Sequence, residues 1–204
     1  MIDVFLKAKH WQLFIPLIII PILGIVYLIF QMLEFAEMPY PAQPDANDVN
    51  SFLSTLMIFV LLPVITLAGW MWSVGVGLND QLHWKLQKNT TLFKICVVLP
   101  AIAALISAFG FVNAIYDPYE SPQLLSFLVV LNLISSLAMF YSFYFMGRII
   151  KTAEHQADVA FRDYLAEIFM IWFYFIGIWF LQPKVNRIIQ KDYSAEPDVM
   201  DHLN

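Results

Sequence analysis

Long apolar runs separated by short polar segments divide the chain. Each of the four longest runs can cross the ~30 Å hydrocarbon core of a bilayer as a helix. None of the four contains Asp, Glu, Lys, Arg or His; they are residues 11–33, 52–76, 95–115 and 124–147. This pattern predicts an all-α integral membrane protein with four transmembrane helices in one membrane domain, residues 1–204.

A fifth apolar segment, residues 167–182, is shorter than the other four. A run of about 14 apolar residues has a length at which a re-entrant or interfacial helix competes with a span. Residues 148–166 before it are predicted to form an amphipathic linker on the membrane surface. After Pro183, residues 183–204 are predicted to form a short surface helix and a tail.

The basic residues give a second, independent pattern. The segments Glu34–Asp48 and Asp117–Glu120 carry acids and no bases. Because basic residues near helix ends stay in the cytoplasm, the alternation predicts a cytoplasmic N-terminus. A fifth span would put the last basic stretch on the opposite side, so the pattern favours a segment that does not cross. The four basic stretches are Lys7–Lys9, Lys85–Lys94, Arg148–Arg162 and Lys184–Lys191.

Composition agrees with a membrane protein and excludes some partners. Of 204 residues, 60% are hydrophobic and 13% charged, whereas soluble domains have roughly 45–50% and 25%. The net charge of −5 argues against a nucleic-acid partner. The lipid bilayer and other membrane subunits are the expected partners.

Small and polar residues in the third and fourth runs predict contacts between these helices, because small side chains let backbones approach and hydroxyls and amides can bond across the gap. The predicted interhelical polar contacts are Asn113, Asn132, Ser135 and Ser136. An alternative is that Asn113 and Asn132, together with Gln31, line a polar site near the middle of the membrane.

The fifth segment and the residues after it carry a second candidate surface. Trp172 and Trp179 are seven residues apart, on one face of a helix. Either they pack against a partner or they line a ligand groove. The residues predicted to contact a partner or lipid are Trp172, Trp179, Gln182, Pro183, Lys184, Asn186 and Arg187.

Candidate chemistry is limited to one group of acids with a histidine, expected at the cytoplasmic face. His155 and Asp158, at i and i+3, are weak candidates for a shared metal ion. Glu154, Asp163 and Glu167 lie nearby in the sequence and offer carboxylates for hydrolysis of a lipid headgroup. No cofactor is predicted, since all four histidines lie outside the apolar runs and bis-histidine haem needs them inside.

Three passages carry a resemblance to a known family: Leu6–Phe14, Trp70–Leu78 and Trp172–Asn186. Together they resemble an uncharacterised family of small multi-pass inner-membrane proteins of Bacteroidota. The resemblance implies a bacterial inner membrane and brings no assigned activity. Members of that family often have proline where this chain has Phe175, and a proline there favours a broken helix.

These patterns leave three hypotheses for function. The first is a non-enzymatic scaffold or accessory subunit of a larger inner-membrane complex. The second is a carrier for a small molecule or lipid, with a polar site at Gln31, Asn113 and Asn132. The third is a lipid-modifying enzyme at the cytoplasmic face, with His155 and Asp158 in its site.

Overall fold

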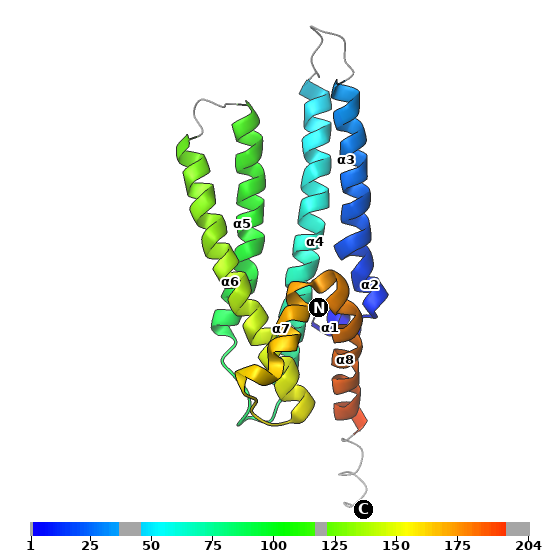
Figure 1. Cartoon of the computed structure of the whole chain (residues 1–204), viewed down its shortest axis with the longest axis vertical. Coiled ribbons are helices and arrows are strands. Elements are labelled where there is room, and N and C mark those ends of the chain that lie inside the picture. The colour runs from blue at the N-terminus through cyan, green and yellow to red at the C-terminus, as the bar shows by residue number, and fades with distance from the viewer. Residues whose placement is uncertain (1, 37–45, 117–121, 195–204) are drawn as a thin grey trace, which may run out of the picture.

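The computed structural model describes residues 2–36, 46–116 and 122–194, and all regular structure in these ranges is helical (Figure 1). A π-helical turn, η1, joins α2 to α3, and a 3-10 turn, η2, precedes α7. The elements are α1 (Ile2–Leu6), α2 (His10–Phe14), η1 (Ile15–Ile19), α3 (Ile20–Ala36), α4 (Ala46–Gln81), α5 (Thr91–Tyr116), α6 (Pro122–His155), η2 (Phe161–Tyr164), α7 (Leu165–Trp172) and α8 (Tyr174–Ser194).

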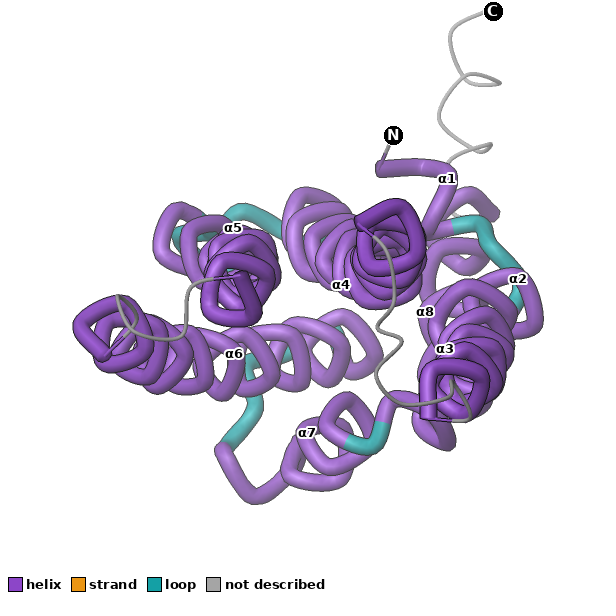
Figure 2. Tube along the Cα trace, turned by 90° about the horizontal axis from the view of Figure 1, so that it is seen from above, coloured by secondary structure: helices purple, strands orange, loops and turns teal. Residues whose placement is uncertain are grey.

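The long helices form two upright pairs, α3 with α4 and α5 with α6 (Figures 1 and 2). Within the described ranges, four segments are long and apolar enough to cross a membrane, which confirms the predicted four-span fold. They are His10–Glu34, Asn50–Gln81, Thr91–Gly110 and Pro122–His155. The connection of residues 82–90 between α4 and α5 lies at the lower end in Figure 1, which we call the basal end.

Side chains hold the basal connections together. The Asn79 side chain donates to the carbonyl of Lys88 at 3.1 Å and accepts from its N–H at 2.8 Å. The Lys88 ammonium lies 3.7 Å from the carboxylate of Asp158, which follows α6. The connection between the two helix pairs is therefore fixed to the segment after α6.

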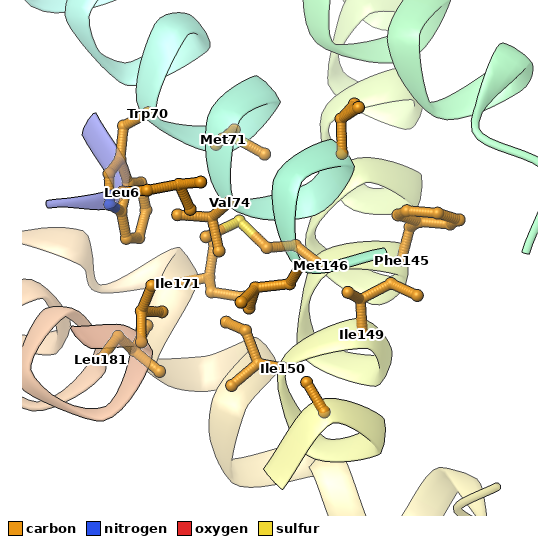
Figure 3. Close-up of a cluster of buried hydrophobic side chains, with 14 of the residues drawn as sticks. Leu6, Trp70, Met71, Val74, Phe145, Met146, Ile149, Ile150, Ile171 and Leu181 are labelled. Atoms are coloured by element: carbon orange, nitrogen blue, oxygen red, sulfur yellow. The ribbon is translucent and has the colours of Figure 1, made fainter. Parts of the chain in front are cut away.

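The buried core lies in the basal half, where α4, α6, α7 and α8 meet (Figure 3). Trp70 and Met146 are fully buried there, as are Ile171 of α7 and Leu181 of α8. In the opposite half, most large side chains of the spans are exposed on the outside of the helix pairs. Membrane helices associate through such close packing and through hydrogen bonds, because the surrounding lipid is as apolar as their side chains.

The segment of residues 148–166 differs from its prediction. Its first part continues α6 as far as His155, so no separate surface helix begins at Arg148. The chain then turns at Gln156, whose φ of 51° is left-handed, a conformation typical of the residue that ends a helix. The N–H of Ala160 donates to the Asp163 carboxylate at 3.0 Å and helps to start the next turn. This reversal directs α7 back along α6.

The fifth apolar segment is a hairpin of two helices. Helix α7 ends at Trp172, the chain turns at Phe173, and α8 returns to the basal end (Figure 1). The break thus lies at Phe173, and Pro183 lies inside α8, which corrects the prediction of a helix ending at Gln182. The hairpin is not among the four described segments long and apolar enough to cross a membrane, and α8 brings Lys184–Lys191 back toward the basal end.

Gly177 permits the tight turn of this hairpin. Its N–H and that of Ile176 both donate to the carbonyl of Phe173, at 2.8 and 2.9 Å. A Cβ atom on Gly177 would overlap the carbonyl oxygen of Met170 in α7. Because backbone atoms cannot rotate away as a side chain can, this position requires glycine.

We predict that Gly177→Ala destabilises the hairpin. Alanine favours a helix by about 1 kcal/mol over glycine, but overlap with a backbone atom costs roughly 3 kcal/mol. Thermal unfolding of the detergent-solubilised protein should therefore show a lower midpoint.

Gly69→Ala is the matched control. A Cβ at this helical position meets only the edge of the Phe5 ring, at 3.0 Å, and a ring can shift. Equal midpoints for the two variants would contradict the proposed requirement for glycine in the turn.

Candidate functional site

Polar side chains on opposite faces of α8 hold the base of the hairpin. Residues 182 and 184 are two positions apart, about 200° around a helix. Gln182 faces α1 and α4, and Lys184 faces α6 and α7. The first face carries a network of amides, and the second carries a cluster of ions.

Gln182 is the centre of the amide network. Its Oε1 accepts a hydrogen bond of 2.7 Å from the indole Nε1 of Trp70. Its Nε2 lies 3.0 Å from the carbonyl oxygen of Phe5 and 2.9 Å from that of Ala8. Asn186, one turn later, donates to the same Ala8 carbonyl at 3.1 Å. Gln182 and Trp70 are both 0% exposed.

This network explains how the short α1 helix is held. A five-residue helix is not stable alone, and its last carbonyls have no partner within the helix. The amides of Gln182 and Asn186 satisfy the carbonyls at and just after the end of α1, while Leu6 packs into the core at 3% exposure. The N-terminal segment is thereby attached to α8 and α4.

The ion cluster on the other face contains two lysines and two glutamates. Lys184 Nζ lies 2.7 Å from Glu154 Oε2 and 2.8 Å from Glu167 Oε1. Lys151 Nζ lies 2.9 Å and 3.5 Å from the same two oxygens. Each lysine thus bridges both carboxylates, and the neutral cluster connects α6, α7 and α8.

Glu167 is the most buried member of the ion cluster. Its side chain is 5% exposed, and its second oxygen, Oε2, has no hydrogen-bond partner among the described residues. Since a buried charge is costly unless it is paired, the two lysines offset the cost of burying this carboxylate.

A partly open cavity of about 860 Å³ adjoins the ion cluster. Its charged lining comprises Glu154, Glu167, Lys184 and Arg187. Its apolar lining includes Met170 of α7 with Trp179 and Phe180 of α8. We call this space the basal cavity; it has the size typical of a small-molecule site.

The residues predicted to contact a partner or lipid divide into two groups. The prediction is wrong for Gln182, because this side chain is fully buried against its own chain. Asn186 bonds to Ala8 in the same network. Lys184 is engaged in the ion cluster. The remaining members have surface to offer: Trp172 is 47% exposed, Trp179 is 44% exposed, and Pro183 and Arg187 line the basal cavity.

His155 and Asp158 are not brought together as metal ligands. Asp158 accepts a 3.0 Å hydrogen bond from Arg148, and this bond, helped by the charge of Lys88, holds the pKa of Asp158 below its usual range. The imidazole of His155 lies 3.9 Å from Glu154 instead. The described ranges contain no group of three or more His, Cys, Asp or Glu residues able to hold a metal ion.

The predicted interhelical contacts are confirmed for one residue. Asn132 of α6 donates to Ser107 of α5 at 2.8 Å. Ser135 and Ser136 instead donate to carbonyls one turn earlier in α6, so their single protons are used within the helix. The side chain of Asn113 lies outside the described part of the chain.

Local sequence patterns carry little signal for the partners of these residues. Lys151 was not singled out, although its spacing of three from Glu154 is that of an ion pair on a helix. The contact between Trp70 and Gln182 joins residues 112 positions apart. No local pattern predicts such a pair, and an alignment showing that the two vary together would be the signal to find it.

Four helices long and apolar enough to span a membrane, with a helical hairpin packed against them, define an all-α multi-pass membrane protein. No protein-family model, curated protein or solved structure matches the chain.

We predict that Gln182→Leu destabilises the protein by roughly 2–4 kcal/mol, because it leaves the Trp70 indole and carbonyls at the end of α1 buried without partners. Chemical unfolding in detergent, followed by tryptophan fluorescence, measures the change. Gln81→Leu, at the exposed end of α4, is the control and should stay within about 0.5 kcal/mol of the parent. Equal effects of the two changes would rule out the network as a clamp.

We predict that Lys184→Met destabilises the base of the hairpin by on the order of 3 kcal/mol, because two carboxylates then share Lys151 alone. Adding Glu167→Gln should restore part of the loss, since the buried charge is removed as well. A double-mutant cycle of unfolding free energies tests this coupling, with Arg162→Met as the control for loss of a basal charge. Strictly additive effects would show that Lys184 and Glu167 do not act together.

Proposed function

We propose that the chain is a non-enzymatic scaffold or accessory subunit of a larger membrane complex, and that the re-entrant hairpin is its docking element. The observation that supports this proposal is the aromatic surface of that hairpin. Six of its seven exposed large apolar side chains are aromatic: Phe169, Trp172, Phe173, Phe175, Trp179 and Phe180, with Ile176 as the seventh.

This surface differs from that of the spans. The exposed apolar side chains of the spans are mostly Ile, Leu and Val, which suit contact with lipid tails. Aromatic residues, and Trp above all, are enriched in the parts of protein interfaces that contribute most to binding. A rigid base with an aromatic surface is therefore better suited to a protein partner than to lipid alone.

The two other hypotheses have less support. The carrier hypothesis places Gln31 and Asn132 in one polar site, but they lie on different helix pairs. Gln31 bonds to Tyr27 of its own helix, and Asn132 bonds to Ser107 of the neighbouring helix α5. The residues named for an enzyme, His155 and Asp158, do not form a common site, and the carboxylates of Glu154 and Glu167 are held by lysines.

The proposed location is a bacterial inner membrane with the basal end in the cytoplasm. All four basic stretches lie in the basal half of the molecule (Figure 1), and basic residues near helix ends are typical of a cytoplasmic face. The N-terminus and α8 then share that side. The resemblance to small multi-pass proteins of Bacteroidota agrees with this location and adds no activity.

Site-specific crosslinking tests the docking role. A photoreactive amino acid at Trp172 or Phe175 should give one protein adduct of the same mass from both positions, because both lie on the proposed docking surface and outside the basal cavity. The control is Leu137, which is 71% exposed on α6 and should crosslink to lipid alone.

Gentle purification of the native protein provides the second measurement. The partner identified by crosslinking should co-purify with the chain in a fixed ratio. A monomer that yields no protein adduct from either hairpin position would refute the proposal.

A further inference from the structure

The basal cavity contains a cation that has no partner. Arg187 is exposed, and it makes no ion pair or hydrogen bond with the described residues. It lies three positions after Lys184 and lines the same cavity, so the two cations are neighbours on one face of α8. A guanidinium in such a place is suited to a planar, bidentate anion such as a phosphate.

The same cavity is lined by the two carboxylates of the ion cluster. Both lysines contact Oε1 of Glu167, and Oε2 of the same carboxylate is shielded from water with no hydrogen-bond donor. Glu154, whose side chain is 33% exposed, lines the cavity beside it. This side of the cavity therefore favours a ligand that carries a positive N–H group.

The remaining wall is apolar and partly exposed. Phe180 is 61% exposed and Trp179 44% exposed. The indole of Trp179 also packs on the ring of His10, with centroids 4.5 Å apart, at the start of the first span. Trp residues are enriched at the headgroup level of a bilayer, and Trp179 lies beside the end of a span. A ligand at that level would have a polar end and an apolar end.

We propose that the basal cavity binds the headgroup of a phospholipid that carries a phosphate and a primary ammonium side by side, as in phosphatidylethanolamine. The phosphate accepts from Arg187, the ammonium donates to the partly exposed carboxylate of Glu154, and the acyl chains follow Trp179 and Phe180 toward the hydrocarbon. A trimethylated headgroup has no N–H to donate, and a glycerol headgroup has no positive charge. The site thus distinguishes headgroups by chemistry, and a bound lipid would cover Trp179 and Phe180 while leaving Trp172 and Phe175 of the docking surface free.

Native mass spectrometry of the delipidated, full-length protein in detergent tests the proposal. It is titrated with phosphatidylethanolamine, phosphatidylcholine and phosphatidylglycerol of identical acyl chains. We expect the ethanolamine lipid to bind roughly tenfold more tightly than either of the others, since a hydrogen bond to a charged group contributes about 1.5–3 kcal/mol. Equal binding of the ethanolamine and choline lipids would overturn the assignment.

A matched pair of variants locates the site. Arg187→Gln should weaken binding of the ethanolamine lipid roughly tenfold, whereas Arg162→Gln, an exposed arginine outside the cavity lining, should leave it unchanged. Equal losses in the two variants would show a nonspecific effect of charge and overturn the site.

Competition with glycerophosphoethanolamine, which is the same headgroup without acyl chains, distinguishes lipid from a free solute. If the lipid is the ligand, displacement requires a large excess of the soluble compound, because the contacts of Trp179 and Phe180 are missing. Displacement at equal concentration would show that a free zwitterion occupies the cavity and would overturn the lipid assignment.

Discussion

The buried side-chain amide of Gln182 is the contact on which the position of the hairpin depends. It accepts from Trp70 in α4 and donates toward the last carbonyls of α1, so three elements meet at one group. Buried polar groups that lose their partners are costly, and the cost is borne by every group in the network at once. The amide therefore fixes the rotation of α8, and with it the face that each neighbouring residue presents.

That rotation has a direct electrostatic consequence. With Gln182 directed inward, Lys184 lies on the opposite face and reaches Glu167 of α7 and Glu154 of α6. Neither clamp resists every movement alone: the amides prevent α8 from leaving α1 and α4, and the ions prevent α7 from leaving α6 and α8. Together they hold both legs of the hairpin at the basal end, and the tight turn at Gly177 needs no further support.

Much of the fold follows from local sequence, and much of the site does not. Spans are set by hydropathy and length, which are local properties, so all four were predictable. Gln182 is predicted to contact a partner or lipid, yet its bonds to Trp70 and to the end of α1 join residues 112 and more positions apart. The break at Phe173 carries no proline or glycine of its own. Its signal, Gly177, lies four residues later, and the requirement for glycine appears only when α7 packs beside it.

The distribution of charge also bears on what the molecule does. A protein that moves ions or protons needs ionisable groups along a path through the membrane, and these are kept in spite of their cost. Among the described residues the buried charged side chain is Glu167 near the basal end, and each carboxylate of its ion cluster is bridged by two lysines. Movement of any one of these groups would break contacts that hold the hairpin in place. The cluster is therefore suited to fixing a surface rather than to moving a charge, and the aromatic residues of the hairpin receive a constant orientation toward whatever binds them.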